Sequence, residues 1–408
     1  PLDGVLFVGL TVGGVATVIE PLVGLTAALF LGPLWAYLRT ELPQVPAQIG
    51  QFFVALTLAA WLARGMARRN LRVSHRSPGR VSAEFDRVPR RSPPLFLPLL
   101  AFLGAALASL WDAVELPVYG VPELIKWVQI VLLFLFVSGY LTAGMETRPM
   151  FHTGDYPMVG IETRPAFRRL RWLLGALLVT GLFQAGVGMF QFGLRGDGPE
   201  HFAILGGRFY RAYGTFEQPN PYAGYLGLML PLALGMFWEW GGKRVWRSRW
   251  VGEERVDEGP RLLVSHLLIY FIPAAAMLAA LAASWSRGAW LGFGAAVLAM
   301  AVALPRRARW GLLLVALLVA GGLGLYATDL LPLSVTDRLT GFAQDVRFED
   351  VRGVGINDAN YAVIERLGHW QAALEMFRHN LWTGVGSGCY EPAYRDFALI
   401  NWPIALGH

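Results

Sequence analysis

The sequence has little charge and a single cysteine. Charged residues make up 16% of the 408 residues, whereas soluble globular proteins average roughly 25%. The one cysteine, Cys389, excludes an intrachain disulfide and a cysteine metal cluster. Hydrophobic residues make up 55%, which excludes a disordered, collagen-like or coiled-coil chain. This composition is typical of a polytopic membrane protein.

Several common motifs of enzymes are also missing. The sequence contains no Walker A motif, no dinucleotide-binding glycine pattern, no GxSxG and no HExxH. No histidines are spaced as metal ligands with a carboxylate nearby. We therefore expect no cofactor and no metal site. Nucleic acid is not expected either, because the arginines cluster between apolar runs rather than along one face.

Long apolar runs predict an all-α fold, a polytopic bundle of about ten transmembrane helices. The runs have 16 to 22 residues, close to the ~20 that cross the hydrocarbon core. The first two are separated only by Glu20 and Pro21, so they could form one broken element or two short helices. The ten runs are 4–19, 21–38, 48–63, 94–114, 123–144, 171–192, 221–240, 262–283, 289–304 and 310–327.

Arginine-rich linkers predict the orientation. Linker 67–93 contains eight arginines, and linker 241–261 and turn 305–309 are also basic. If the spans alternate, all three lie on one side, which the positive-inside rule assigns to the cytoplasm. The predicted domains are a bundle over 1–327 and an extracytoplasmic loop domain over 328–408.

The segment 328–408 differs from the rest in charge. It has ten Asp and Glu against six Arg. Within it, residues 365–379 place Leu367, Trp370, Leu374 and Phe377 on one helical face. This pattern predicts an amphipathic helix that does not span the membrane.

Arg287 is the first candidate site residue, because ionisable groups at membrane depth are costly. It lies between two spans, with Ser286, Gly288 and Ala289 as small neighbours. The alternative is an arginine that only extends to the interface beside tryptophans. The small neighbours favour close approach of a ligand or helix.

The segment 206–225 is the second candidate. It carries Arg208, Arg211, Gln218 and Asn220 directly before a span. Arginine binds phosphate through a planar fork, and the N–H groups of a helix start add positive charge. With Arg287 on the same side, these residues predict a site for a pyrophosphate or another polyanionic head group. The alternative is a polar outer loop with a turn at Gly214.

Histidines are the third candidate. Any one of the four expected outside the membrane could act as a base, although a single histidine is more often structural. The four are His201, His369, His379 and His408.

Three stretches together resemble the O-antigen ligase and polymerase superfamily of bacterial membrane glycosyltransferases. The resemblance covers about residues 200–408. The stretches are RAYGTFEQPNPYAGYL from Arg211, with LPL from Leu230; SRGAWLG from Ser286; and ERLGHWQAAL from Glu365, with GVGSG from Gly384 and then Tyr394. Gln218 departs from the family pattern, which usually has Asn there. His408 would match the first histidine of the family's H-x-H-N motif.

The resemblance implies transfer of a glycan from a polyprenyl-pyrophosphate donor to an acceptor hydroxyl on lipid A core, glycan or protein, at the periplasmic face of a bacterial inner membrane. Arginines can stabilise the charge of a leaving pyrophosphate without a metal, so we expect metal-independent transfer. We assign Arg211 and Arg287 to the pyrophosphate and His408 to the general base. Arg208 and Arg366 are further anion-binding candidates, and Gln218 and Asn220 would orient the substrate.

Two alternatives come from other classes of function. One is a transporter of a small anion, although few charged residues lie inside the spans to form a relay. The other is a non-catalytic membrane subunit that keeps the fold.

Overall fold

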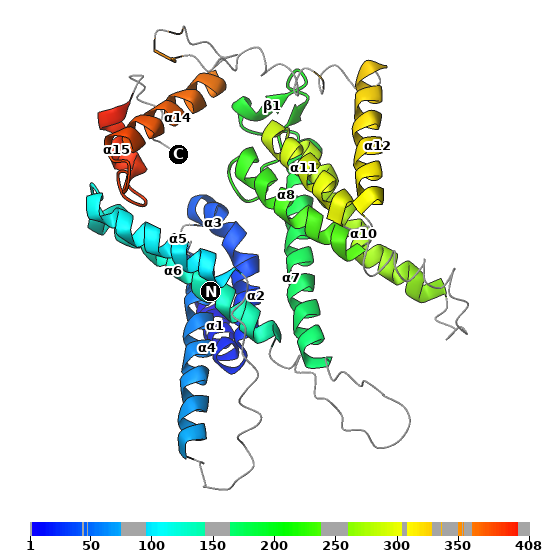
Figure 1. The fold of residues 1–408 in the computed structure, drawn as a ribbon. Coiled ribbons are helices and arrows are strands. Elements are labelled where there is room, and N and C mark those ends of the chain that lie inside the picture. The colour runs from blue at the N-terminus through cyan, green and yellow to red at the C-terminus, as the bar shows by residue number, and fades with distance from the viewer. Residues whose placement is uncertain are drawn as a thin grey trace. The chain divides into compact units, whose positions relative to one another are not determined.

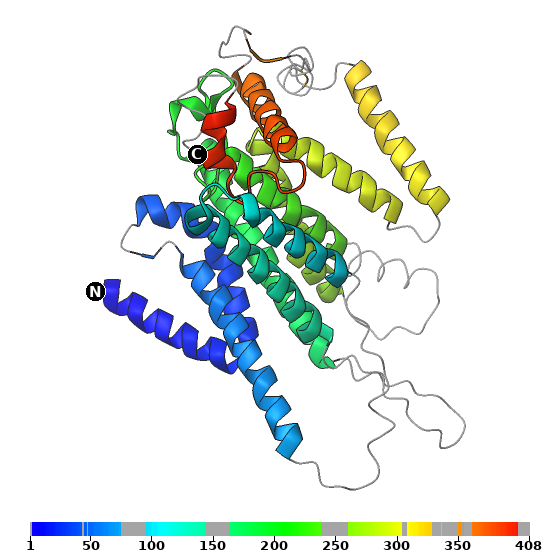
Figure 2. The same ribbon diagram turned by 60° about the vertical axis from the view of Figure 1, so that its left-hand side comes forward.

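The structure is a computed structural model, and it is almost entirely helical. It describes residues 2–42, 45–46, 48–74, 95–142, 164–237, 260–303, 308–328, 336, 350–352, 354 and 361–398. The elements form two compact units, Pro1–Ala60 with Phe167–Leu339, and Trp61–Ala166 with Thr340–His408. Figure 1 and Figure 2 show the elements in two views.

The first unit holds the N-terminal helices and the middle of the chain. Its elements are α1 (Leu2–Ile19), α2 (Pro21–Leu31), the 3₁₀ turn η1 (Gly32–Leu34), α3 (Trp35–Glu41), the start of α4 (Ile49–Ser74), nearly all of α7 (Arg164–Met189), η5 (Phe190–Leu194), η6 (Glu200–Phe202), β1 (Ala203–Ile204), β2 (Phe209–Tyr210), α8 (Pro219–Met236), α10 (Pro260–Ala283), α11 (Arg287–Ala303) and α12 (Ala308–Ala327). The two strands form a small antiparallel hairpin that pairs Ala203 with Tyr210.

The second unit contains the rest of α4 and two further pairs of helices. Its elements are α5 (Phe96–Ser109), η3 (Leu110–Asp112), η4 (Leu116–Gly120), α6 (Val121–Thr142), α14 (Tyr361–His379) and α15 (Tyr390–Phe397). Helices α5 and α6 pack against each other through Phe102 and Trp127, whose ring centroids lie 4.5 Å apart. Helices α14 and α15 share a small core of Ala372, Met376, Ala393 and Tyr394.

The described part of every predicted apolar run is largely helical, but ten membrane spans are not supported. Among the described residues, five helices are long and apolar enough to cross a membrane. Four further apolar helices have only 10–17 described residues, namely Phe7–Ile19, Phe96–Asp112, Leu268–Ala283 and Arg287–Ala303, whereas at 1.5 Å per residue a helix needs ~20 to cross the core. The five are Pro21–Glu41, Ile49–Ala67, Leu116–Tyr140, Arg168–Leu194 and Arg309–Ala327. The structure thus supports an all-α membrane protein with fewer spans than expected.

The ambiguous first pair of runs forms two helices. Glu20 separates them, and its carboxylate accepts a hydrogen bond from the Leu22 N–H at the start of α2. This is the usual way in which a side chain caps a helix start. Pro21 suits the first position of α2, because its missing N–H would have no partner there.

The helix predicted for 365–379 is present, and most of its predicted apolar face is exposed. The helix α14 covers this range, and Leu367 is buried as expected. Trp370, Leu374 and Phe377, however, are exposed. The apolar periodicity predicted the helix, but it could not predict which of its apolar side chains are buried.

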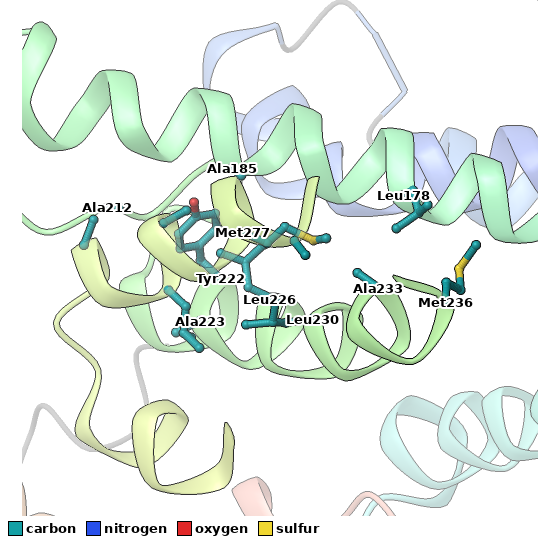
Figure 3. Packing of buried hydrophobic residues seen from close by; sticks show 14 residues of the cluster. Leu178, Ala185, Ala212, Tyr222, Ala223, Leu226, Leu230, Ala233, Met236 and Met277 are labelled. Carbon is teal, nitrogen blue, oxygen red and sulfur yellow. The ribbon is translucent and has the colours of Figure 1, made fainter. Parts of the chain in front are cut away.

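The core of the first unit lies where α7, α8 and α10 meet (Figure 3). On α8, Tyr222, Leu226, Leu230 and Ala233 are fully buried at intervals of three and four residues, as expected for one face of a helix. From α10, Met277 packs beside Gly181 of α7, where an added Cβ would lie 2.6 Å from the Met277 sulfur. Small residues therefore let these helices approach closely.

Gly188 makes the closest contact between α7 and α8. A Cβ atom at this position would lie 1.9 Å from the Tyr222 hydroxyl oxygen. That hydroxyl donates a hydrogen bond of 3.1 Å to the backbone oxygen of Gln184, one turn earlier on α7. Gly188 thus leaves the space that the tyrosine ring needs.

Gly188→Ala should therefore destabilise the first unit by roughly 1–3 kcal/mol, the usual cost of overpacking a core. We expect a melting temperature several degrees below that of the unaltered protein in detergent. The control is Gly186→Ala on the same helix, where nothing lies within 4 Å of an added Cβ. Equal melting temperatures for the two variants would contradict the close contact.

Candidate functional site

Arg211 connects three segments that are distant in the sequence. Its side chain is half-buried. Its Nε donates a hydrogen bond of 3.0 Å to the Ser284 backbone oxygen, and its Nη2 donates one of 3.3 Å to Asn220 Oδ1. The Ser286 hydroxyl donates to the same oxygen at 2.9 Å. The loop before α8, the first turn of α8 and the segment before α11 thus meet at Arg211 and Asn220.

Arg287 comes directly after Ser286 and is the first residue of α11. Its side chain is half-buried. Within α11, Trp290 donates the first backbone hydrogen bond, to the oxygen of Ser286. The three preceding N–H groups, of Arg287, Gly288 and Ala289, belong to a first turn, where N–H groups lack an acceptor inside the helix. Arg287 and the N-terminus of α11 therefore directly follow Ser286, which belongs to the cluster around Arg211, and a guanidinium and a helix N-terminus both favour an anion.

The start of α8 differs from the start of α11. Pro219 and Pro221 have no N–H, and the N–H of Tyr222 donates to the Gln218 oxygen at 3.4 Å. The expectation of several free N–H groups at this helix start is therefore wrong, since two of the four positions cannot donate. Of the two helix starts, α11 offers more donors to an anion.

Two glutamines of α7 hold the loop that carries Arg211. Gln184 donates to the Thr215 hydroxyl at 2.8 Å and accepts from the Thr215 N–H at 3.2 Å. Gln191 donates to the Gly214 oxygen at 2.8 Å and accepts from the Tyr213 N–H at 3.2 Å. Both glutamines are buried. Because each amide uses both of its ends on the loop backbone or on Thr215, the loop has little freedom to shift along α7.

Further contacts fix the loop from the other side. The Thr215 hydroxyl donates to the Pro33 oxygen at 2.7 Å, and the Tyr37 N–H donates to the Thr215 oxygen at 3.3 Å. The Ala212 N–H donates to the Ala283 oxygen at 3.0 Å, just before Ser284. The position of Arg211 thus depends on α3, α7 and the end of α10 together.

Left-handed backbone conformations precede both helix starts. Glu217, just before the cap of α8, has φ of 59°, and Trp285, just before Ser286, has φ of 55°. Such conformations in residues other than glycine cost on the order of 1–3 kcal/mol and are concentrated at functional sites. Gly214 also has a positive φ, and a Cβ there would lie 2.5 Å from the Tyr222 ring. The loop needs glycine at 214 for both reasons.

The other predicted site residues have weaker structural support. Gln218 is exposed and makes no capping hydrogen bond to α8. Arg208 is exposed on the hairpin, with its guanidinium 5.5 Å from the centre of the Phe209 ring. Arg366 lies on α14 in the second unit. His408 lies outside the described residues, so its role as the base stays a prediction.

Sequence reasoning missed Gln184, Gln191 and Ser284. The glutamines are seven residues apart inside an apolar run, so they lie on the same helical face. Polar side chains inside a span are costly unless satisfied, and this spacing could have indicated them. Ser284 acts through its backbone oxygen, which leaves no signal in the side-chain pattern.

One histidine of the second unit has a defined partner. His369 Nδ1 lies 2.7 Å from the Tyr390 hydroxyl, which also lies 3.2 Å from the His369 backbone oxygen. Burial raises the pKa of Tyr390 to about 12, so the phenol keeps its proton at neutral pH. This contact joins α14 to α15 and gives His369 a structural role.

Within the part of the chain that the structure describes, no group of three or more His, Cys, Asp or Glu side chains is placed to hold a metal ion. Metal-independent transfer stays a prediction.

Comparison with known proteins identifies a family for the C-terminal third. Residues 272–408 match the family model described as O-Antigen ligase. No curated protein and no solved structure matches the chain. The matched range includes Arg287 and the stretches from Ser286 and Glu365, whereas the stretch from Arg211 precedes it. The match relates residues 272–408 to ligases that transfer a glycan, and the apolar helices are typical of a multi-pass membrane protein. The similarity of residues 272–408 to the O-antigen ligase family agrees with the superfamily that the motifs predict.

Proposed function

We propose that the protein transfers a glycan from a polyprenyl-pyrophosphate donor to an acceptor hydroxyl at the outer face of a bacterial cytoplasmic membrane. The observation that carries this proposal is the hydrogen-bonded cluster of Arg211, Asn220 and Ser286. Ser286 directly precedes Arg287, the first residue of α11. Two guanidinium groups and first-turn N–H groups suit a diphosphate, which is the leaving group of such a donor.

In this mechanism the arginines stabilise the leaving group. Breaking the bond from the anomeric carbon to the pyrophosphate oxygen leaves negative charge on that oxygen. Donors fixed in advance stabilise such charge most effectively, because they need not reorganise during the reaction. Arg211 is fixed by Ser284 and Asn220, which supports this role. Arginines would supply the positive charge without a metal.

The acceptor hydroxyl attacks the anomeric carbon from the opposite side and loses its proton to a base. We assign the base to His408, because neutral imidazole accepts a proton near neutral pH. Asn220 would orient the donor. Arg208, Arg366 and Gln218 stay secondary candidates. The acceptor is a lipid, a glycan or a protein hydroxyl.

Arg211→Lys and Arg287→Lys should each lower the transfer rate by roughly 100-fold or more, because one ammonium cannot replace the planar fork. The assay is glycan transfer by the full chain, purified and reconstituted with a lipid-pyrophosphate donor. Arg352→Lys is the matched control, since Arg352 is exposed and paired with Asp350 outside the site. Full activity of both site variants would refute the pyrophosphate assignment.

His408→Ala should abolish transfer while binding of the donor lipid stays within a few-fold of normal, because a base acts on the acceptor rather than on the pyrophosphate. Donor binding is measured with a labelled lipid, and transfer in the same preparation. Loss of binding together with transfer would assign His408 to the donor site. Unchanged transfer would exclude it as the base.

The outer-face location is tested with cysteines and a membrane-impermeant thiol reagent. The natural Cys389 is buried, so an exposed thiol is introduced with Glu391→Cys on α15. In intact cells this variant should react. Arg249→Cys, in the linker predicted to be cytoplasmic, should react only after the cells are opened. The reverse pattern would overturn the orientation.

A further inference from the structure

Helix α14 carries an exposed apolar stripe. Trp370 is 64% exposed, Leu374 46% and Phe377 53%. Steps of four and three residues place them on one face of the helix. Directly after the helix, Leu381 is 60% exposed and Trp382 98%. The opposite face packs inside the unit through Ala372 and Met376, and Ile364 and Leu367 are buried near the start of the helix. The helix is therefore apolar on two sides, and the described part of its own unit covers one of them.

The end of this stripe is attached to the turn between α5 and α6. The Thr383 hydroxyl hydrogen-bonds to the Asp112 carboxylate. The Ser387 N–H donates to the Ser109 hydroxyl at 3.0 Å. Gly386 lies so close to Ala113 that an added Cβ would be 2.6 Å from its Cα. The segment that follows α14 is thus fixed to the last residues of α5 and η3.

Exposed tryptophans lie on both sides of this attachment. Trp111 precedes Asp112 and is 90% exposed, and Trp382 precedes Thr383. Both side chains therefore project near one hydrogen bond at the end of α5. Tryptophan is enriched where a membrane meets water, because its ring is apolar while its indole N–H can donate.

The attachment also lies at the start of a candidate membrane span. The helical segment Leu116–Tyr140, which comprises η4 and α6, is long and apolar enough to cross a membrane. Gly388 packs against its first turns, since an added Cβ would lie 2.9 Å from the Tyr119 oxygen and 2.8 Å from Glu123 Cβ. The exposed side chains of η4 include Leu116 and Val118. The segment that follows the stripe therefore packs against the start of a candidate membrane span.

We propose that α14 lies along the membrane surface, with its stripe inserted into the interfacial layer of the bilayer. The occupant of this face is phospholipid. With 19 residues and several charges the helix is too polar to span, as expected for helices that lie in the interface plane. Arg366 and Arg378 are exposed on α14, where their long side chains can extend to phosphate head groups. This inference does not depend on the proposed function.

Site-directed spin labelling tests the proposal on the full chain in phosphatidylethanolamine and phosphatidylglycerol nanodiscs. Nitroxides are placed at Trp382→Cys, Phe377→Cys and Leu374→Cys. The natural Cys389 stays, because it is buried. Collision rates are measured with oxygen, which concentrates in lipid, and with a water-soluble nickel chelate. The control is Glu391→Cys on α15, an exposed position away from the stripe.

At the stripe positions, the ratio of oxygen to nickel collisions should exceed that at residue 391 by several-fold. A ratio equal to that of the control would show that the face lies in water and would overturn the proposal. Low collision rates with both reagents would show that protein covers the face, and would overturn it as well. Trp382 is nearly fully exposed, so replacing it removes no core contact and folding is retained at that position.

Discussion

The contact between α7 and α8 determines where the candidate site lies. Gly188 gives Tyr222 room to reach α7, and the tyrosine hydroxyl binds the backbone of Gln184. Once α8 is seated in this way, its first turn can present Asn220 to Arg211. The site therefore depends on a packing constraint at Tyr222, two residues from Asn220 in the first turns of α8. In an apolar surrounding, where the hydrophobic effect between helices is weak, such close contacts and buried hydrogen bonds supply much of the association.

The buried glutamines of α7 and the loop that carries Arg211 satisfy each other's hydrogen-bonding groups. Gln184 and Gln191 would be costly in an apolar helix if left unpaired. Each instead bonds to a loop whose backbone also needs partners, because the left-handed Gly214 and the irregular course of the loop prevent regular pairing. Among the described side chains, no buried nitrogen or oxygen lacks a hydrogen-bond partner. The hydrogen bonds that offset the cost of burying the glutamines also immobilise the loop that carries Arg211.

The sequence predicted the helices and the family, for identifiable physical reasons. Apolar runs and helix-start residues are local signals, so helices such as α8 and α11 were found within a few residues. The role of Arg287, in the motif from Ser286, stays a prediction. The described residues support five spans rather than ten, because the length of an apolar run does not fix the length of the helix that it forms. The exposed face of α14 was not foreseen, since periodicity cannot tell which neighbour covers a face. The link from Arg211 to Ser284 runs through a backbone oxygen and is invisible in the sequence.

Asn220 shows why an amide suits its position better than a carboxylate. Its Oδ1 accepts from both Arg211 and Ser286, so the amide orientation is fixed and the NH₂ group is directed away from those two donors. An approaching oxygen would meet hydrogen atoms there. An aspartate would accept the same two bonds, but it would present a second negatively charged oxygen and would neutralise part of the arginine charge. The asparagine side chain thus has two faces of opposite polarity, one that holds the arginine in place and one that can donate to an oxygen beyond it.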